Sequence, residues 1–139
     1  PEPLSEDFNS EYLFAKSRGR TSSVKQFIMD AKVVVGVGNI YANEALFMSG
    51  IRPDRAANRI SSIRYQRLVQ AIKEVLDFAI GVGGTTLRDF VGGDGKAGYF
   101  ARQLTVYGRG GQACTNCGRV LKEIRQSNRS SVFCQGCQR

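Results

Sequence analysis

Two pairs of cysteines are the residues in this chain whose type and spacing are best suited to chemistry. Cys114 and Cys117 form one pair, Cys134 and Cys137 form the other, and sixteen residues separate the two pairs. Each pair offers two thiolates from one tight turn, and two such turns complete the tetrahedral shell that Zn²⁺ prefers. The sequence contains no histidine, so a metal site built here uses sulfur alone. We therefore predict one structural zinc ion bound by the four cysteines.

Two other uses of the cysteines fit the sequence less well. A pair of disulfides needs an oxidising compartment, and the sequence has neither an apolar signal segment nor a transmembrane run. A redox CxxC normally stands alone near a βαβ unit, whereas these pairs have the spacing of a zinc ribbon. The sequence therefore favours structural zinc and predicts no association with a membrane.

The residues between the two cysteine pairs are expected to form a β-hairpin. Residues 120–124 predict one strand, 127–130 a turn with Arg129 at its tip, and 131–133 the return strand. A ribbon of this size cannot bury a core of its own, so its fold is expected to depend on the metal.

The composition indicates one modest core and an anionic partner. The 139 residues are 42% hydrophobic, and 20 Lys and Arg against 12 Asp and Glu give a formal net charge of +8. Beyond residue 96 the only acidic residue is Glu123, so the positive charge is concentrated on the ribbon and its approach. A basic surface of this kind favours nucleic acid as the partner.

The first ninety residues predict a helical region that must position the ribbon. A first helix is expected after Ser5, whose hydroxyl can cap it. Residues 32–35 have the composition of a short buried strand. A further helix is expected from Asn39 to Gly50, because glycine suits a left-handed C-cap. Apolar residues at helical spacing predict a long helix over 61–80.

A glycine turn, Gly36-Val37-Gly38, leads into the helix that begins near Asn39. The third glycine of a dinucleotide-binding fingerprint falls on Tyr41 here, and the βαβ context is missing, so that interpretation fails. Free N–H groups at a helix N-terminus beside an amide side chain suit a phosphate. The alternative is that Asn39 only caps its own helix.

The chain resembles the bacterial formamidopyrimidine-DNA glycosylase family over essentially its whole length. The segments that carry the resemblance occur in the family's order: Lys32–Ala42 (KVVVGVGNIYA), Gly83–Phe90 (GGTTLRDF), Gly98–Phe100 (GYF), Val106–Arg109 (VYGR) and the four-cysteine ribbon. Endonuclease VIII shares the architecture, but the Gly-Gly-Thr-Thr segment and Asn39-Ile40-Tyr41 favour the former family.

This resemblance implies a mostly α fold, with a helix–two-turn–helix domain followed by a small four-cysteine zinc-ribbon β-hairpin. The expected divisions are a DNA-binding domain over residues 1–90, a glycine-rich lesion loop and connector over 91–111, and a zinc finger over 112–139. The implied partner is damaged double-stranded DNA, bound by a monomer in the bacterial cytoplasm.

By resemblance, the chain is the DNA-binding portion of a base-excision-repair glycosylase and AP lyase. Such enzymes remove oxidised purines, including 8-oxoguanine and formamidopyrimidines. The family's nucleophile is an N-terminal proline in an N-terminal catalytic domain, whereas Pro1 resembles the start of the family's interdomain segment. We therefore expect that domain in cis outside this sequence, no catalytic residue here, and no activity from this piece alone. A rival hypothesis is a non-enzymatic zinc-ribbon adaptor that binds nucleic acid or protein.

The resemblance also assigns roles to four residues of the described motifs. Asn39, Tyr107 and Arg129 match positions that contact DNA phosphates, and Glu44 matches a glutamate that faces the active site. The alternatives are plain packing for Tyr107, a solvated turn residue for Arg129 and a surface carboxylate for Glu44.

The glycine-rich stretch beyond the long helix resembles the loop that closes over an everted base. Glycine suits such a loop because backbone groups must approach the flipped base closely. The alternative is a linker. The expected lesion-loop residues are Gly92, Gly93, Gly95, Gly98 and Tyr99.

Overall fold

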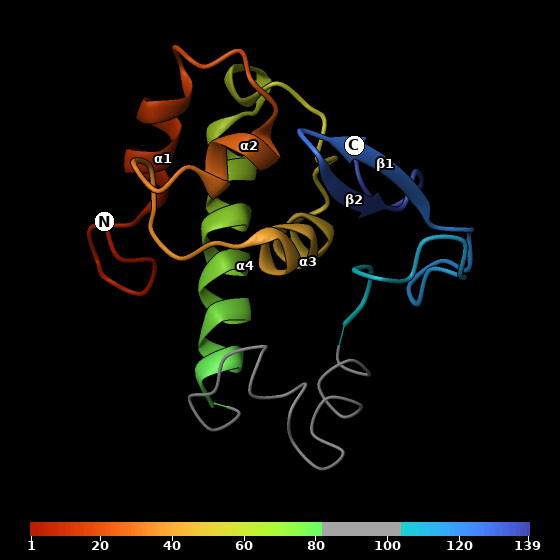
Figure 1. Cartoon of the computed structure of the whole chain (residues 1–139). Coiled ribbons are helices and arrows are strands. Elements are labelled where there is room, and N and C mark those ends of the chain that lie inside the picture. Colours follow the sequence, from red (N-terminus) through yellow and green to blue (C-terminus); the bar gives the residue numbers. More distant parts are fainter. Residues whose placement is uncertain (82–103) are drawn as a thin grey trace.

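A body of helices carries a two-stranded hairpin along one side (Figure 1). The structure is a computed structural model that describes residues 1–81 and 104–139. The elements are α1 (Ser10–Ser17), α2 (Val24–Met29), α3 (Asn39–Ser49), the 3-10 turn η1 (Ala57–Arg59), α4 (Ser62–Gly81), β1 (Lys122–Gln126) and β2 (Arg129–Phe133). The expected mostly helical fold with a hairpin is confirmed. No described helix is long and apolar enough to cross a membrane.

Helix α4 is the element against which the rest of the helical body packs, since both α1 and α3 lie on it. Its buried Tyr65 joins two neighbours, because the rings of Phe14 and Phe27 both meet it edge to face. The Tyr65 hydroxyl donates to the Ala57 carbonyl at 2.7 Å. Burying this large ring therefore leaves no unpaired hydroxyl, which is the condition for a stable buried tyrosine. Ile63, in the first turn of α4, is 60% exposed although it is apolar.

The first helix begins later than expected. Its cap is Asn9, whose side-chain oxygen accepts from the Tyr12 amide at 2.9 Å, and Ser5 instead donates to the Glu2 carbonyl. Asn and Ser are both good caps. The choice between them depends on where the helix must start in order to bury Leu13.

The strand predicted over residues 32–35 is wrong, because this segment folds as turns. The amides of Val33 and Val34 both donate to the Asp30 carbonyl, at 2.8 and 3.1 Å. The Asp30 carboxylate also accepts from the Lys32 amide. The two valines are buried, so their apolar, β-branched character reflects burial and not an extended backbone.

The ends of α3 were predicted correctly. Gly38 is its N-cap, with no side-chain capping bond, and Gly50 ends it with a φ of 75°. Asn39 is therefore the first helical residue and does not cap its own helix, so that alternative is wrong.

The hairpin turn is tighter than predicted. Ser127 and Asn128 both have positive φ, 50° and 66°, which is the two-residue geometry that matches the twist of paired strands. Arg129 is the first residue of β2, paired with Gln126, and not the residue at the tip. Its side chain is exposed beside the turn.

Candidate nucleic-acid interface and metal centre

The four cysteines meet at one point, as the spacing predicted. Their sulfur atoms all lie within 4.8 Å of one another, and all four thiols are free. Cys117 and Cys134 are 3.4 Å apart at sulfur, and Cys114 and Cys137 are 3.9 Å apart. Tetrahedral Zn–S bonds of about 2.3 Å place sulfur atoms about 3.8 Å from one another. The donor set therefore fits a zinc ion, and the free thiols argue against the disulfide alternative.

The surroundings favour the thiolate form of Cys117, whereas at Cys137 the Asn116 amide is outweighed by burial and by the neighbouring thiols, which raise its pKa to about 11. The backbone N–H of Arg119, and then the thiol of Cys134, lower the pKa of Cys117 to about 6. Asn116 donates its backbone N–H to the Cys114 sulfur and its side-chain amide to the Cys137 sulfur, at 3.4 and 3.2 Å. Such outer hydrogen bonds orient the ligands of a metal site.

Several hydrogen bonds dock the hairpin on the helical body, and three of them share one carbonyl. The Ser130 carbonyl accepts from Lys25 Nζ at 2.9 Å, and from the side-chain amides of Asn39 and Asn43 at 3.3 Å each. Asn43 also accepts from the Val132 amide at 2.7 Å. Three donors from α2 and α3 thus converge on β2, and they set the position of the hairpin relative to both helices.

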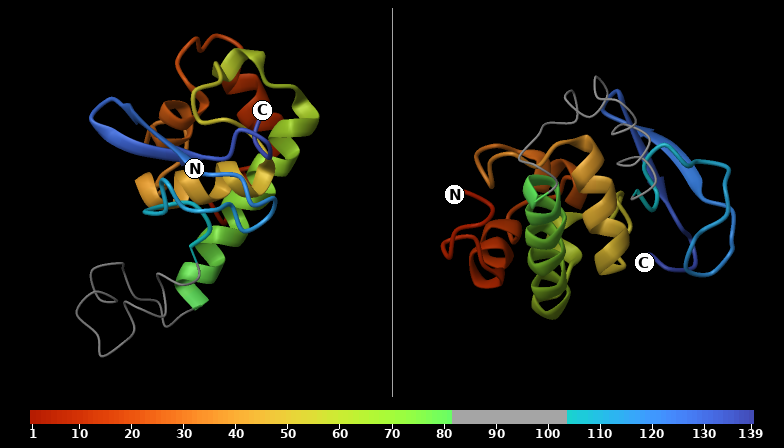
Figure 2. Two further views of the ribbon diagram at one scale, coloured as in Figure 1. Left: turned by 90° about the vertical axis from the view of Figure 1, so that its right-hand side faces the viewer. Right: turned by 90° about the horizontal axis from the view of Figure 1, so that it is seen from below.

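This docking brings Asn39 close to Arg129, because Ser130 is the neighbour of Arg129 in β2. In the left panel of Figure 2, the hairpin turn and the start of α3 lie toward the same side of the molecule. The remaining N–H of the Asn39 amide makes no hydrogen bond to the described residues, so it can donate to an anion. The free N–H groups at the start of α3 lie on this same side of the molecule, and the hairpin turn there is followed by the exposed Arg129.

Glu44 is buried, with 7% of its surface exposed, so the surface-carboxylate alternative is wrong. One carboxylate oxygen accepts from the amide and the hydroxyl of Thr105, both at 2.7 Å. The other accepts from the amides of Val106 and Tyr107, both at 2.9 Å. Glu44 therefore fixes the backbone that carries Tyr107, and it reaches this segment across 61 to 63 residues of sequence.

Lys25 is a functional candidate that the sequence analysis missed. It is 2% exposed, and it donates to Ser131 Oγ at 2.6 Å as well as to the Ser130 carbonyl. Burial, followed by repulsion from Arg129, lowers its pKa from 10.5 to about 8. The signal in the sequence was faint: a lysine beside Val24, Phe27 and Ile28, on the buried side of a short helix.

The remaining predicted positions are placed as follows. The Pro1 carbonyl accepts from the Val35 amide at 3.1 Å, which ties this residue to the turns before α3. The predicted lesion-loop residues lie outside the described residues: Gly92, Gly93, Gly95, Gly98 and Tyr99.

Two family models match the chain. The formamidopyrimidine-DNA glycosylase H2TH domain matches residues 1–91, and a zinc finger found in FPG and IleRS matches residues 111–139. The chain belongs to the formamidopyrimidine-DNA glycosylase family. The zinc-finger match agrees with the four adjacent sulfurs, so a zinc-finger module is the correct description of the hairpin and its cysteines.

Family members of known name and structure match over nearly the whole chain. A formamidopyrimidine-DNA glycosylase from Idiomarina loihiensis is 63% identical over 139 residues, which are all of this chain and 52% of that protein. The Lactococcus lactis Fpg, in complex with abasic-site DNA, is 33% identical with a TM-score of 0.87, over 99% of this chain and 51% of that one.

The MutM (Fpg) protein from Thermus thermophilus is 34% identical with a TM-score of 0.85, over 99% of this chain and 53% of that one. The chain thus spans about half the length of the glycosylases that it matches. The fold and membership are shared with these proteins over that half.

Proposed function

We propose that this chain forms the DNA-binding part of a base-excision-repair glycosylase. In this proposal the chain binds damaged double-stranded DNA. Residues outside this sequence perform the chemistry on oxidised purines such as 8-oxoguanine and formamidopyrimidines. The AP lyase step belongs to those other residues as well, and the chain alone has no catalytic activity.

The observation that carries the proposal is the convergence on the Ser130 carbonyl. Because Lys25, Asn39 and Asn43 hold this carbonyl, the start of α3 lies beside the strand whose first residue is the exposed Arg129. Two donor groups on separate elements can then bind neighbouring phosphates of one strand. Such contacts set the position of a duplex without reading its sequence, as a lesion-searching protein requires.

Each part of the interface has a separate task. A zinc ion bound by the four cysteines supplies no chemistry to DNA and holds the hairpin ends together. Arg129 offers a planar pair of N–H donors to phosphate. Glu44 fixes the backbone at residues 105–107, so that Tyr107 is presented as a third phosphate contact.

Binding of duplex DNA to the zinc-loaded chain, measured by fluorescence anisotropy at several salt concentrations, tests the proposal. Losing one phosphate contact is expected to weaken binding about tenfold at low salt and to reduce the salt slope by about one. We expect both changes for Arg129→Ala, whereas Asn39→Ala removes a neutral donor and should weaken binding without changing the salt slope. The matched control is Lys16→Ala, which also removes one charge but from exposed α1.

Equal binding by the parent and the Arg129→Ala chain would contradict the phosphate role. Absence of any DNA binding by the zinc-loaded parent would favour the adaptor hypothesis, in which the ribbon binds protein. A carbonyl adduct trapped by borohydride on abasic duplex would instead show that this chain has catalytic activity, through the Pro1 amine.

The proposed function also includes the domain divisions, the zinc content, the oligomeric state and the location of the protein. The family resemblance supports three divisions of the chain, at residues 1–90, 91–111 and 112–139, and closure of the glycine-rich stretch on a lesion. It also supports a single zinc ion, a monomeric state and a location in the bacterial cytoplasm. Limited proteolysis, metal analysis and sedimentation of the chain address the divisions, the zinc content and the oligomeric state.

A further inference from the structure

A second group of cations lies at the other end of α3, away from Asn39. Arg64 donates to the Gly50 carbonyl at 2.8 Å and to the Arg139 carbonyl at 2.7 Å. Gly50 is the C-cap of α3, whereas Asn39 is its first residue. A helix of this length separates the two places by about 16 Å.

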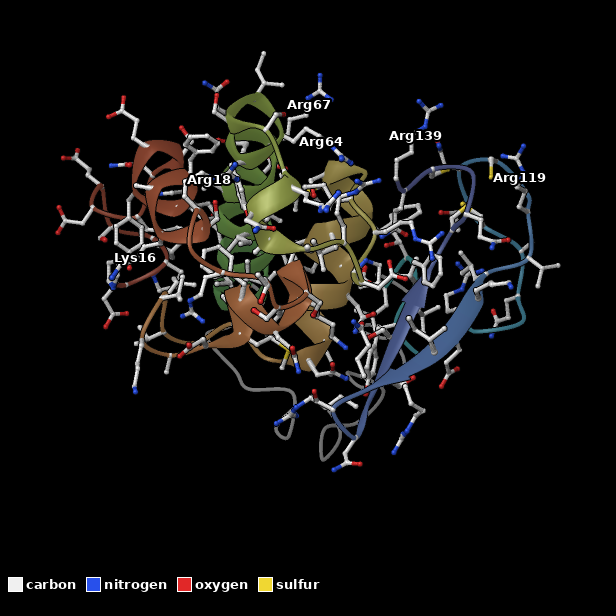
Figure 3. All side chains as sticks on the ribbon, turned by 90° about the horizontal axis from the view of Figure 1, so that it is seen from above. Lys16, Arg18, Arg64, Arg67, Arg119 and Arg139 are labelled. Carbon is white, nitrogen blue, oxygen red and sulfur yellow. The ribbon has the colours of Figure 1, made fainter. Side chains whose placement is uncertain are left out.

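The cations at this end form a row that crosses from the helical body to the zinc finger. In Figure 3, Arg67, Arg64, Arg139 and Arg119 lie along one edge, and the hairpin turn lies at the opposite edge. Arg67 lines a groove of about 470 Å³ together with Thr115, Asn116 and Cys137 of the zinc finger. Arg119 packs over Gly136 within the zinc finger, and the row crosses between the two modules where Arg64 donates to the Arg139 carbonyl.

These arginines have no acidic partners among the described residues. The two ion pairs found there are Arg20–Asp30 and Arg52–Asp54. Repulsion from Arg55, Arg67 and Arg139 adds to burial in lowering the pKa of Arg64. The like charges of Arg64, Arg67 and Arg139 repel one another, and an anion bound beside them would relieve this repulsion.

We propose that this row, Arg64, Arg67, Arg119 and Arg139, is a second DNA-binding surface that holds another duplex segment through its phosphates. Hereafter it is called the arginine row. Binding of the first duplex, at the Asn39–Arg129 side, rests on the proposed function. Binding of the second duplex, at the arginine row, does not. The chain then bridges two segments, with the Asn39–Arg129 side on one and the arginine row on the other.

DNA is favoured over an acidic protein for two reasons. A duplex carries about one charge per 1.7 Å of axis, so a row of guanidiniums from separate elements meets a regular series of anions. In addition, a long DNA bound at the first surface keeps its own remote segments at a high effective concentration near the second. A bridging protein can pass from one segment to the next without entering free solution.

Energy transfer between two short duplexes, one with a donor dye and one with an acceptor, tests the bridge. We expect transfer with the zinc-loaded parent at low salt, and its loss at a large excess of protein, when each duplex binds a separate chain. Arg67→Glu combined with Arg139→Glu is expected to reduce transfer about tenfold. Binding of a single duplex, followed by anisotropy, should change less than twofold in this variant.

The controls separate the two surfaces. Lys16→Glu reverses one exposed charge on α1, as Arg67→Glu alone does in the arginine row. Lys16→Glu should retain transfer, whereas Arg67→Glu alone should reduce it. Asn39→Ala combined with Arg129→Ala should weaken the single-duplex binding on which the proposed function depends.

Other results of these two measurements distinguish failure of the second DNA-binding surface from failure of the proposed function. Single-duplex binding by the parent without transfer overturns the second surface and leaves the proposed function intact, whereas no binding at all overturns the proposed function. Transfer that persists in the Arg67→Glu, Arg139→Glu chain, or that is lost equally in Lys16→Glu, also overturns the second surface. Binding of a polyglutamate peptide that needs Arg67, without transfer between duplexes, assigns the arginine row to an acidic protein instead.

Discussion

Replacing Glu44 by glutamine is expected to release the segment that carries Tyr107. Each carboxylate oxygen accepts two hydrogen bonds, so four donors depend on this side chain. Glutamine keeps one acceptor oxygen and places an N–H₂ group where the other oxygen was. With the N–H₂ group on the Thr105 side, the Thr105 hydroxyl can turn to accept from it, so the Thr105 amide is the one donor that necessarily loses its bond.

The size of the effect follows from the burial of those donors. An unpaired buried N–H costs about 1–3 kcal/mol. The bond from the Val106 amide is buried, whereas those from Thr105 and Tyr107 are partly buried. One partly buried amide lies in the lower half of this range, so Glu44→Gln is expected to lower the free energy of unfolding by about 1–2 kcal/mol.

Urea unfolding of the zinc-loaded chain measures the total effect, and hydrogen exchange of the amides of residues 105–107 locates it. Faster exchange there with an unchanged urea midpoint indicates that the segment opens locally. Glu11→Gln, which alters an exposed carboxylate on α1, is the matched control. A change below about 0.5 kcal/mol, with exchange of the three amides unaltered, would refute the role assigned to Glu44.

Three further predictions concern the hairpin and its docking. Removal of zinc by a chelator is expected to abolish the fixed structure of β1 and β2 while the helical circular dichroism persists, because the helices have their own core. The pKa of Lys25 is lowered from 10.5 to about 8 in the folded chain, so the unfolded chain binds more protons between these values. The free energy of unfolding should therefore rise with pH from about 8 to about 10.5, and Lys25→Met should abolish this rise in pH-dependent urea melts. Gly50→Ala is expected to cost about 1–2 kcal/mol, measured by thermal unfolding, because Gly50 has a φ of 75° and a Cβ there would lie 3.3 Å from the Cys137 carbonyl oxygen.

Local features of the sequence predicted the structure correctly where one residue type decides the local backbone. Gly50 ends α3 because its backbone is left-handed, which few other residues tolerate. The long helix α4 follows from apolar residues at helical spacing, and the predicted range of 61–80 differs from Ser62–Gly81 by one residue at each end. The cysteine spacing likewise predicted four sulfurs at one point.

Local features predicted the wrong structure where more than one residue, or more than one backbone conformation, fits the same segment. Val33 and Val34 are apolar because they are buried in turns, and the composition of residues 32–35 alone could not distinguish this from a strand. Asn9 was chosen over Ser5 as the cap of α1 although both are good caps. Arg129 was placed at the hairpin tip because the turn was taken as four residues, whereas two residues of positive φ complete it.

The sequence by itself determined the helices, the glycine-ended α3 and a hairpin closed by four cysteines, because these depend on residues near one another in the chain. It also indicated a basic ribbon. Only the tertiary structure decided that Lys25, Asn39 and Asn43 share the Ser130 carbonyl, and that Glu44 holds residues 105–107. These contacts join residues 61 to 105 positions apart. No local pattern specifies them, since a buried polar group takes its partner from whatever packing brings within hydrogen-bond distance.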